Sequence, residues 1–399
     1  MDKKNKNPNV PNLRFSFEED WCTSTIGENF RLSSGLTPST KEKAYFNNGI
    51  IPWINSGELK NKYISFTENK LTLDAVKKHN LTIYPMDTMV IAIYGLEAAG
   101  VRGKASITKM DSTISQSCMA FNSLGNVLTQ FMYYVYKKEA QILGTRYAQG
   151  TKQQNLSSDL LSSYKLLYPS KEEQLKIVNF LSLIDEKIET QSKIIDDCIS
   201  YRNAIVDYYF ESLSGNWKKV KLSNILKEYS ELHIKDDSIV HATLSKEGIF
   251  PKTDRYDRDF LVKDEDKKYK VTHLNDICYN PANLKFGVIT RNTFGDCIIS
   301  PIYITFKIKS GFIPKFVELL VTRKQFISKA RKYEQGTVYE RMSVNSSDLL
   351  SMYVLIPSFS IQQKIVNIIN NIDNKIFNEQ KLLNLYKLQK VYLLKNMFI

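Results

Sequence analysis

The chain has 399 residues, well past the size at which single hydrophobic cores stop growing, so two or more domains are expected. No apolar run follows the polar first residues, and none reaches the roughly 18 residues of a membrane span, so we expect neither a secretory signal nor a membrane protein. Lys and Arg exceed Asp and Glu by 55 − 42 = 13. This excess favours a nucleic-acid partner, although a solubility charge or an AT-rich genome explains it equally well.

The first segment, residues 1–168, has short apolar runs between turn residues, which is typical of a mixed α/β domain. Trp21 stands near its start. An aliphatic strand is predicted over 85–93, after a turn that contains Asp, and Gly100-Val101 follows. The same order of features, a tryptophan, a turn that contains Asp, a strand and then Gly-Val, occurs again in residues 215–356.

Residues 169–214 carry a long helical pattern just after Pro169, a position where proline is tolerated before a helix. Its inward-facing positions alternate steps of four and three residues, which is the heptad spacing of a coiled coil. This seam consists of Ile177, Leu181, Ile184, Ile188, Gln191, Ile195, Cys198, Arg202, Ile205 and Tyr209.

Residues 215–356 repeat the plan of the first segment. Trp217 stands near the start, an aliphatic strand follows an Asp-containing turn over 274–280, and Gly287-Val288 comes next. The apolar and aromatic run 298–308 also predicts strand structure. The stretches between these shared landmarks differ in length and chemistry, so we expect a common framework with divergent insertions.

A second helical segment, residues 357–399, repeats the seam at an offset of 188 residues. Two amphipathic helices on separate domains are one explanation, but the matching register favours helices 171–213 and 359–398 packing antiparallel on each other. At ~1.5 Å per residue, about 40 residues give a rod of about 60 Å. The second seam consists of Ile365, Ile369, Ile372, Ile376, Glu379, Leu383, Tyr386, Lys390, Leu393 and Met397.

Four landmark pairs around the helices keep nearly constant offsets, which chance hardly supplies in order. They are Gly150 with Gly336 (336 − 150 = 186), Asp159 with Asp348 (348 − 159 = 189), Pro169 with Pro357 (357 − 169 = 188) and Asp185 with Asp373 (373 − 185 = 188). The predicted fold class is therefore α/β (α+β): two domains alternating with two long helices, related by a pseudo-twofold internal repeat.

The sequence contains no recognisable catalytic or metal-binding motif. The segment 95–104 resembles a phosphate loop, but Val101 stands where the lysine must follow the second glycine. The segment 280–283 lacks the second proline and the aromatic residue of an adenine methyltransferase motif, and we interpret it as a turn between strands. Glu58-Leu-Lys60 has nuclease-like spacing without a supporting Asp motif. The five scattered cysteines indicate reduced thiols in a cytoplasmic protein, and the four histidines lack metal-ligand spacing. We predict no catalytic residue and no bound metal.

The repeat, the two seams and the missing motifs together resemble the specificity subunit of type I restriction–modification enzymes, over nearly the whole chain. The resemblance is strongest in the Gln-Gly-Thr…Ser-Asp-Leu-Leu…Pro…Gln…Lys-Ile-Val runs at 149–178 and 335–366. It extends to the Pro-Trp-Ile-Asn-Ser-Gly-Glu-Leu run at 52–59, the opening at 9–15, and the second segment at 254–260 and 279–287. Cys22 to Thr25 depart from the charged residues usual in the family, which leaves the start of the first strand open.

The resemblance implies that residues 1–168 and 215–356 are target-recognition domains, each reading half of a split, asymmetric site in double-stranded DNA. It implies that the helices form an antiparallel coiled coil that fixes the spacing. The chain itself then needs no cofactor. Modification subunits, two of them, dock on the helices and carry S-adenosylmethionine, and restriction subunits carry the nuclease and the motor, with ATP and Mg.

Candidate DNA contacts come from polar or Gly-bearing stretches, since Arg reads guanine, Asn and Gln read adenine, and Lys often binds phosphate. The candidates are Arg102, Lys104, Arg146, Lys152, Gln153, Gln154, Arg255, Tyr256, Arg258, Lys285, Arg291, Tyr339 and Arg341. A rival interpretation is a restriction fragment or methyltransferase with its own activity, and another is a coiled-coil scaffold without a DNA role.

Overall fold

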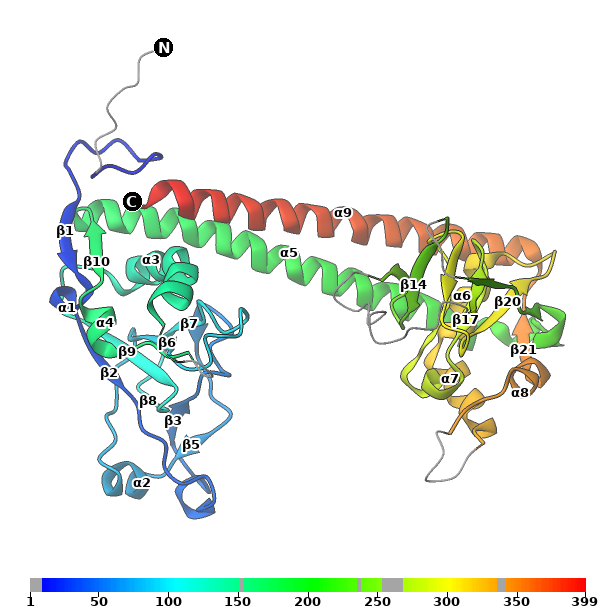
Figure 1. The fold of residues 1–399 in the computed structure, drawn as a ribbon, viewed down its shortest axis with the longest axis horizontal. Helices are drawn as coiled ribbons and strands as arrows, with labels where there is room; N and C mark the ends of the chain where they lie inside the picture. The colour runs from blue at the N-terminus through cyan, green and yellow to red at the C-terminus, as the bar shows by residue number, and fades with distance from the viewer. Residues whose placement is uncertain (1–8, 149, 151–153, 235–237, 253–267, 336–341) are drawn as a thin grey trace, which may run out of the picture. The chain divides into compact units, whose positions relative to one another are not determined.

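The computed structural model describes residues 9–148, 150, 154–234, 238–252, 268–335 and 342–399. The chain divides into two compact units (Figure 1): unit 1 comprises Met1–Lys193 with Lys381–Ile399, and unit 2 comprises Ile194–Gln380. Each unit combines one α/β domain with parts of two long helices, as the sequence repeat predicts. Among the described helices, none is both long and apolar enough to cross a membrane.

The α/β domain of unit 1 centres on a five-stranded sheet of order β2-β9-β6-β7-β4, in which the β4–β7 pair is parallel. Strand β6 alternates between two clusters because successive side chains point to opposite faces. Met89 and Ile91 pack in the core formed with helix α3, whereas Val90 and Ala92 face a second cluster that includes strand β3. A smaller sheet, β5-β3-β8, and an antiparallel ribbon, β1-β10, complete the domain.

The elements of this domain are, in chain order, β1 Cys22–Thr25, α1 Ile26–Asn29, β2 Phe30–Ser34, the 3-10 turn η1 Lys43–Tyr45, β3 Ile51–Ile54, β4 Tyr63–Ile64, β5 Lys70–Leu71, α2 Leu73–Lys78, β6 Met89–Ala92, β7 Ala105–Thr108, β8 Thr113–Ile114, β9 Cys118–Ser123, α3 Thr129–Ile142, the π-helical turn η2 Leu143–Tyr147, α4 Ser158–Ser162 and β10 Lys165–Tyr168. The first strand thus begins directly after Trp21, which answers the question that the unusual residues 22–25 left open.

The α/β domain of unit 2 has a four-stranded sheet, β12-β20-β17-β18, a five-stranded sheet, β13-β16-β19-β14-β15, and a ribbon, β11-β21. Its elements are η3 Ser214–Asn216, β11 Lys218–Lys221, η4 Leu222–Asn224, β12 Leu226–Tyr229, β13 Leu232–Ile234, β14 Val240–Leu244, β15 Ile249–Pro251, β16 Lys268–Thr272, β17 Ile277–Tyr279, η6 Pro281–Phe286, β18 Ile289–Arg291, β19 Cys297–Ile299, β20 Ile304–Ile308, α6 Pro314–Thr322, α7 Lys324–Ala330, η7 Arg331–Tyr333, α8 Ser346–Ser351 and β21 Tyr353–Ile356. The run 298–308 therefore contributes to two strands.

The strand order of the first sheet is the same in both domains. The order β12-β20-β17-β18 repeats β2-β9-β6-β7, and the ribbon β11-β21 repeats β1-β10. Before the equivalent strands β6 and β17, Asp87 and Asn275 both adopt the left-handed conformation, with φ of 63° and 74°. Asp and Asn tolerate this region better than other side chains, so the turn itself is repeated. We call β2-β9-β6-β7 and β12-β20-β17-β18 the framework sheets.

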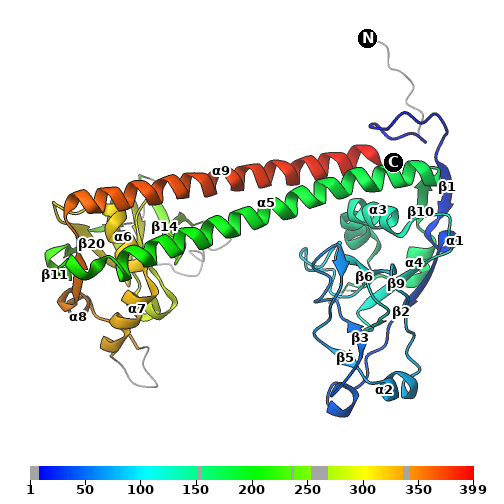
Figure 2. The same ribbon diagram turned by 180° about the vertical axis from the view of Figure 1, so that it is seen from behind.

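Helices α5, Lys171–Glu211, and α9, Phe359–Met397, contribute to both units. In unit 1 the beginning of α5 packs with the end of α9 (Figure 1), and in unit 2 the end of α5 packs with the beginning of α9 (Figure 2). The helices are therefore antiparallel, and the predicted packing of the two helices on each other is confirmed. None of the twenty seam residues is exposed; Leu181 and Ile369, which are equivalent, are both fully buried.

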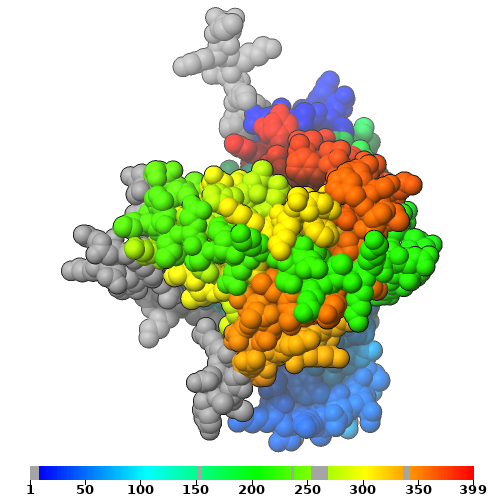
Figure 3. Space-filling model, turned by 90° about the vertical axis from the view of Figure 1, so that its right-hand side faces the viewer, coloured from blue at the N-terminus to red at the C-terminus, as the bar shows by residue number. Residues whose placement is uncertain are grey.

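Matched aromatic clusters join each helix end to its domain. In unit 2 Phe210, near the end of α5, stacks on Phe316 with 5.3 Å between ring centroids and lies 5.2 Å from Trp217. In unit 1 the end of α9 repeats this arrangement 188 residues further along the chain (398 − 210 = 188). There the ring centroid of Phe398 lies 5.3 Å from that of Phe131 and 6.3 Å from that of Trp21. On the face of unit 2 in Figure 3, the green residues that follow α5 meet orange residues near the start of α9, in keeping with the β11–β21 pairing.

A buried glutamine at the start of each long helix makes the same hydrogen bonds in both units. Gln174 donates to the carbonyl of Pro169 at 2.9 Å, and its side-chain oxygen accepts from the amide of Leu128 at 2.8 Å. Gln362 donates to the carbonyl of Pro357 at 3.2 Å and accepts from the amide before α6 at 3.1 Å. Each side chain satisfies backbone groups that would otherwise be buried without partners, so it fixes the helix start against the domain.

Candidate DNA-recognition surfaces

The candidate DNA contacts of unit 1 gather in one loop cluster next to helix α3. Arg102 donates to the carbonyl oxygens of Leu96 and Glu97, at 2.7 and 3.2 Å. Gly144, in the π-helical turn after α3, lies so close that an added Cβ would come within 2.8 Å of the Arg102 side chain. The exposed Arg146 belongs to the same turn. The structure therefore brings two of the predicted arginines to one site from segments far apart in sequence.

The chain returns to this cluster at Gln154. Its amide donates to a carboxylate oxygen of Glu97 at 2.9 Å, and its carbonyl accepts from the amide of Leu96 at 3.1 Å. The amide of Gln154 holds the pKa of the exposed Glu97 carboxyl below its usual value. Lys104 is half-buried just before β7. Lys152 and Gln153, also predicted, lie outside the described residues, as do Arg255, Tyr256, Arg258, Tyr339 and Arg341 of the second domain.

In unit 2 the exposed Lys285 lies at the edge of a basic groove of about 1080 Å³ between α5, η6 and α7. The residues 280–283 form a turn between β17 and β18, as interpreted from the sequence, and the Asn280 side chain caps it by accepting from the amide of Ala282 at 3.1 Å. Four further cations line the groove together with Glu247 as its one carboxylate among the described residues: Arg202, Lys246, Lys324 and Arg331.

Sequence reasoning missed these four cations as possible DNA contacts. Arg202 was assigned to the helix seam alone, and Lys246, Lys324 and Arg331 belong to no recognisable motif. Their common feature is that they line one groove with Lys285, which only the fold reveals. Three of the groove's cations are ion-paired: Arg202 with Asp373, Lys246 with Glu247 and Arg331 with Glu334. Cations still outnumber these carboxylates, which favours a polyanion such as a phosphate backbone.

Arg291 has a different environment from the other candidates. Its Nε donates to a carboxylate oxygen of Glu318 at 2.8 Å, and another guanidinium nitrogen donates to the Asn275 side chain at 2.7 Å. Only 16% of the Arg291 side chain is exposed. These bonds fasten strand β18 to helix α6 and to the turn before β17, so the guanidinium already serves the domain interior.

The segments that resemble catalytic motifs have structural roles. The loop 95–104 leads into strand β7 rather than a helix, so it lacks the helix N-terminus on which a phosphate loop depends. The Glu58 carboxylate accepts from the amides of Asn55 and Glu68 at 3.1 and 2.8 Å and so stabilises its own loop. Among the described residues, no group of three or more His, Cys, Asp or Glu side chains is arranged to hold a metal ion.

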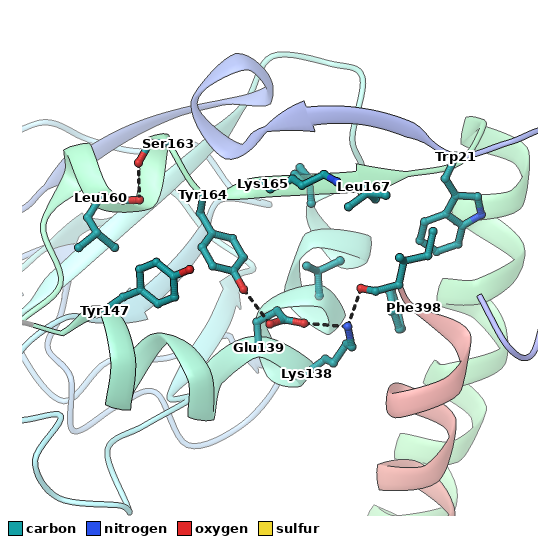
Figure 4. Close-up of a pocket in the computed structure, with 13 residues that line it drawn as sticks. Trp21, Lys138, Glu139, Tyr147, Leu160, Ser163, Tyr164, Lys165, Leu167 and Phe398 are labelled. Atoms are coloured by element: carbon teal, nitrogen blue, oxygen red, sulfur yellow. Dashed lines mark hydrogen bonds and ion pairs between the residues drawn. The ribbon is translucent and has the colours of Figure 1, made fainter. Parts of the chain in front are cut away.

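A cleft of about 490 Å³ in unit 1 lies where α9 ends beside the domain (Figure 4). Its polar groups are bonded to one another. Lys138 donates to the carbonyl of Ile399 at 2.6 Å and pairs with Glu139 at 2.8 Å, and the Tyr164 hydroxyl donates to Glu139 at 2.8 Å. The cleft therefore anchors the helix end. None of the described DNA-contact candidates lines it, although Arg146 belongs to the neighbouring η2 turn.

Comparison with known proteins identifies the family. Residues 18–197 match the family model described as the type I restriction modification DNA specificity domain. The specificity subunit of the type I restriction enzyme MjaIX from Methanocaldococcus jannaschii is 25% identical over 400 residues, covering 91% of this chain and 89% of that protein. The chain belongs to the type I restriction–modification specificity subunits.

Other relatives of this specificity subunit agree. A type I specificity subunit of Escherichia coli is 26% identical over 208 residues, 52% of this chain and 51% of that protein. The crystal structure of the type I S subunit from M. genitalium has the same fold, with a TM-score of 0.56 and 16% identity over 98% of this chain and 99% of that one. A structure described for complex assembly and conformational transition of the type I system gives a TM-score of 0.57, with 9% identity over 96% and 99% of the two chains. The chain is thus a type I DNA specificity subunit that shares the fold of these two structures.

Proposed function

We propose that this specificity subunit binds a bipartite, asymmetric site in double-stranded DNA and that each α/β domain reads one half. The observation that carries the proposal is the contrast within the repeat: the framework sheets have the same strand order, whereas the second sheets, β5-β3-β8 and β13-β16-β19-β14-β15, do not. A pseudo-twofold arrangement suits the symmetry of the duplex, and divergent parts in equivalent places suit two different half-sites.

The contact surfaces follow from charge and donor chemistry. In unit 1 the loop cluster contains Arg102, Arg146 and Gln154, whose side chains are of the types that read base edges, and Lys104 follows Arg102 by two residues. Arg102 uses part of its guanidinium on the carbonyls of Leu96 and Glu97, and Arg146 is exposed. In unit 2 the basic groove with Lys285 suits the phosphate backbone. Arg291 is omitted because it is bonded within its domain. The remaining sequence candidates stay in the proposal: Lys152, Gln153, Arg255, Tyr256, Arg258, Tyr339 and Arg341.

We further propose that two modification subunits dock on the helix pair and bring S-adenosylmethionine to the DNA, and that restriction subunits bring ATP, Mg and the nuclease. The exposed faces of α5 and α9 supply apolar side chains for docking, among them Leu183, Tyr201, Leu385 and Leu388. The complex would act on cytoplasmic DNA, where the five free cysteines stay reduced.

The test is to map methylated adenines in DNA treated with the chain, with the modification subunit, and with both together. We expect methylation at one split sequence, and only when both proteins are present. Methyl transfer by the purified chain alone would instead favour an enzyme with its own activity. Methylation by the pair without any sequence preference would contradict the proposed role.

A further inference from the structure

One carboxylate in unit 1 joins both long helices to the α/β domain. Asp185 on α5 accepts a charge-assisted hydrogen bond from Lys390 of α9 through one oxygen. Its other oxygen accepts from the hydroxyl of Tyr134, on α3 of the domain, at 2.7 Å. Lys62, which precedes β4, lies 4.0 Å from the same oxygen and donates to Tyr134 and to Ser182 of α5, both at 2.8 Å.

The equivalent carboxylate in unit 2 makes the same three-way connection with different partners. Asp373, on α9, accepts from Arg202 of α5 through one oxygen and pairs with Lys315 of α6 at 3.2 Å through the other. Lys315 also pairs with Glu318 at 3.4 Å, and Glu318 holds Arg291 of strand β18. The repeat thus exchanges the helices: an Asp on α5 meets a Lys on α9, and an Asp on α9 meets an Arg on α5.

Each of these carboxylates fixes the orientation of its α/β domain on the helices as well as the distance between them. The two oxygens of a carboxylate point apart in one plane, so an Asp with a helix partner on one oxygen and a domain partner on the other resists rotation of the domain about the helices. The Asp185 and Asp373 side chains are only 21% and 31% exposed, so water replaces the lost partners poorly. The apolar seam determines how the two helices pack on each other, but it does not determine the angle of the α/β domain on the helix pair.

We propose that Asp185 and Asp373 are positioning residues that hold each recognition domain at a fixed angle on the helix pair and thereby set the accepted gap between the two half-sites. The inference rests on the proposed function. One base pair of gap corresponds to about 3.4 Å along the duplex and to about 35° of turn about its axis, so the angle of a domain on the helices bears directly on which gap fits.

The test uses the full chain with its modification subunit and a panel of duplexes with constant half-sites and gaps one base pair shorter, correct or one longer. The ratio of methylation rates at the correct gap and at the altered gaps is measured. We expect Asp185→Asn and Asp373→Asn each to lower this ratio by roughly tenfold, the effect of losing one strongly coupled pair. Both half-site sequences should remain required. The matched control is Glu189→Gln, which breaks an exposed Glu189–Lys193 pair on α5, and the ratio should stay unchanged.

Two single-contact variants separate domain positioning from simple helix stability. Tyr134→Phe removes only the domain-side hydroxyl, and we expect it to lower the gap ratio in the same direction. Lys390→Gln removes the helix-side partner, and its effect should not exceed that of Asp185→Asn. An unchanged ratio in Tyr134→Phe, or a uniform loss of methylation at all gaps in both Asp variants, would overturn the inference. If the unaltered chain shows no half-site requirement at all, the proposed function fails instead.

Discussion

The two α/β domains share one half of their architecture and differ in the other. The framework sheets keep their strand order, and the elements that join them to the helices are matched side chain by side chain: Phe398 with Phe210, and Gln174 with Gln362. The second sheet, in contrast, has three strands in unit 1 and five among the described residues of unit 2. We infer that packing against the helix pair constrains one side of each domain and leaves the other side free to diverge.

The strongest prediction concerns the seam, where the units should be equally sensitive. Leu181→Ala in unit 1 and Ile369→Ala in unit 2 each remove a fully buried side chain at equivalent positions. We expect each to lower the free energy of unfolding by about 2–5 kcal/mol, through lost burial and the cavity that remains. Urea unfolding followed by tryptophan fluorescence measures both, since Trp21 and Trp217 lie at the two joints. A near-neutral effect in one unit would break the equivalence.

The glutamine joints should give the next largest effect. In Gln174→Leu and Gln362→Leu, an apolar side chain fills most of the space of the glutamine. Each change leaves a buried backbone amide and a buried backbone carbonyl without their hydrogen-bond partner. The expected loss is about 1–3 kcal/mol in each unit. The exposed neighbour Gln363, whose side chain donates to Asn367 one turn further along α9, provides the control as Gln363→Leu. Loss in Gln363→Leu as large as in Gln362→Leu would argue against a specific joint.

A pH effect should distinguish the polar network of unit 1. Burial lowers the pKa of Lys62 to about 8, while the unfolded chain keeps this proton to a higher pH. The unfolded state therefore binds more protons above pH 8, so the free energy of unfolding should rise between pH 8 and 10, by on the order of 1 kcal/mol. Lys62→Met should reduce this rise, and the remainder is due to Lys137, whose pKa burial also lowers to about 8. Lys193→Met, at a side chain that is 72% exposed on α5, should leave the rise in place; a rise that persists fully in Lys62→Met would contradict the assignment.

The smallest effect is expected from the basic groove. Lys285→Ala should weaken binding to all duplexes alike and flatten the log–log dependence of affinity on salt by about one unit, because one phosphate contact is lost. Lys219→Ala, an exposed lysine of β11 outside the groove, serves as the control. Fluorescence anisotropy at several salt concentrations measures both. A loss confined to one DNA sequence would instead make Lys285 a base-reading residue.

Most of the framework could be predicted from the sequence, because side chains buried at regular intervals along a helix or strand produce a regular spacing of apolar residues. The four–three spacing predicted both helices to within two residues of their observed ends, and the constant offset predicted their packing on each other. In the sequence, Asp185 is only a landmark of the repeat and Arg202 only a polar position of the seam. Their pairing with Lys390 and Asp373 could not be predicted, since it depends on how the helices meet and not on spacing along one helix.

The candidate DNA contacts were less predictable for a physical reason. Residue type identified donors, but it did not distinguish a guanidinium bonded within the domain, as in Arg291, from an exposed one, as in Arg146. The basic groove gathers cations from α5, a β-hairpin loop, η6 and α7 that no local motif links. Only long-range packing brings such residues together, whereas the framework can be predicted from the local spacing of apolar residues.

Methylation mapping of an exchanged chain tests most directly whether the two domains, which share a common framework, read separate half-sites. Residues 217–335 are replaced by the matching segment of a relative with a known site, and the hybrid is assayed with its modification subunit. We predict a new sequence in one half-site, with the other half-site and the gap unchanged. A simultaneous change in both half-sites would contradict independent reading by the two domains.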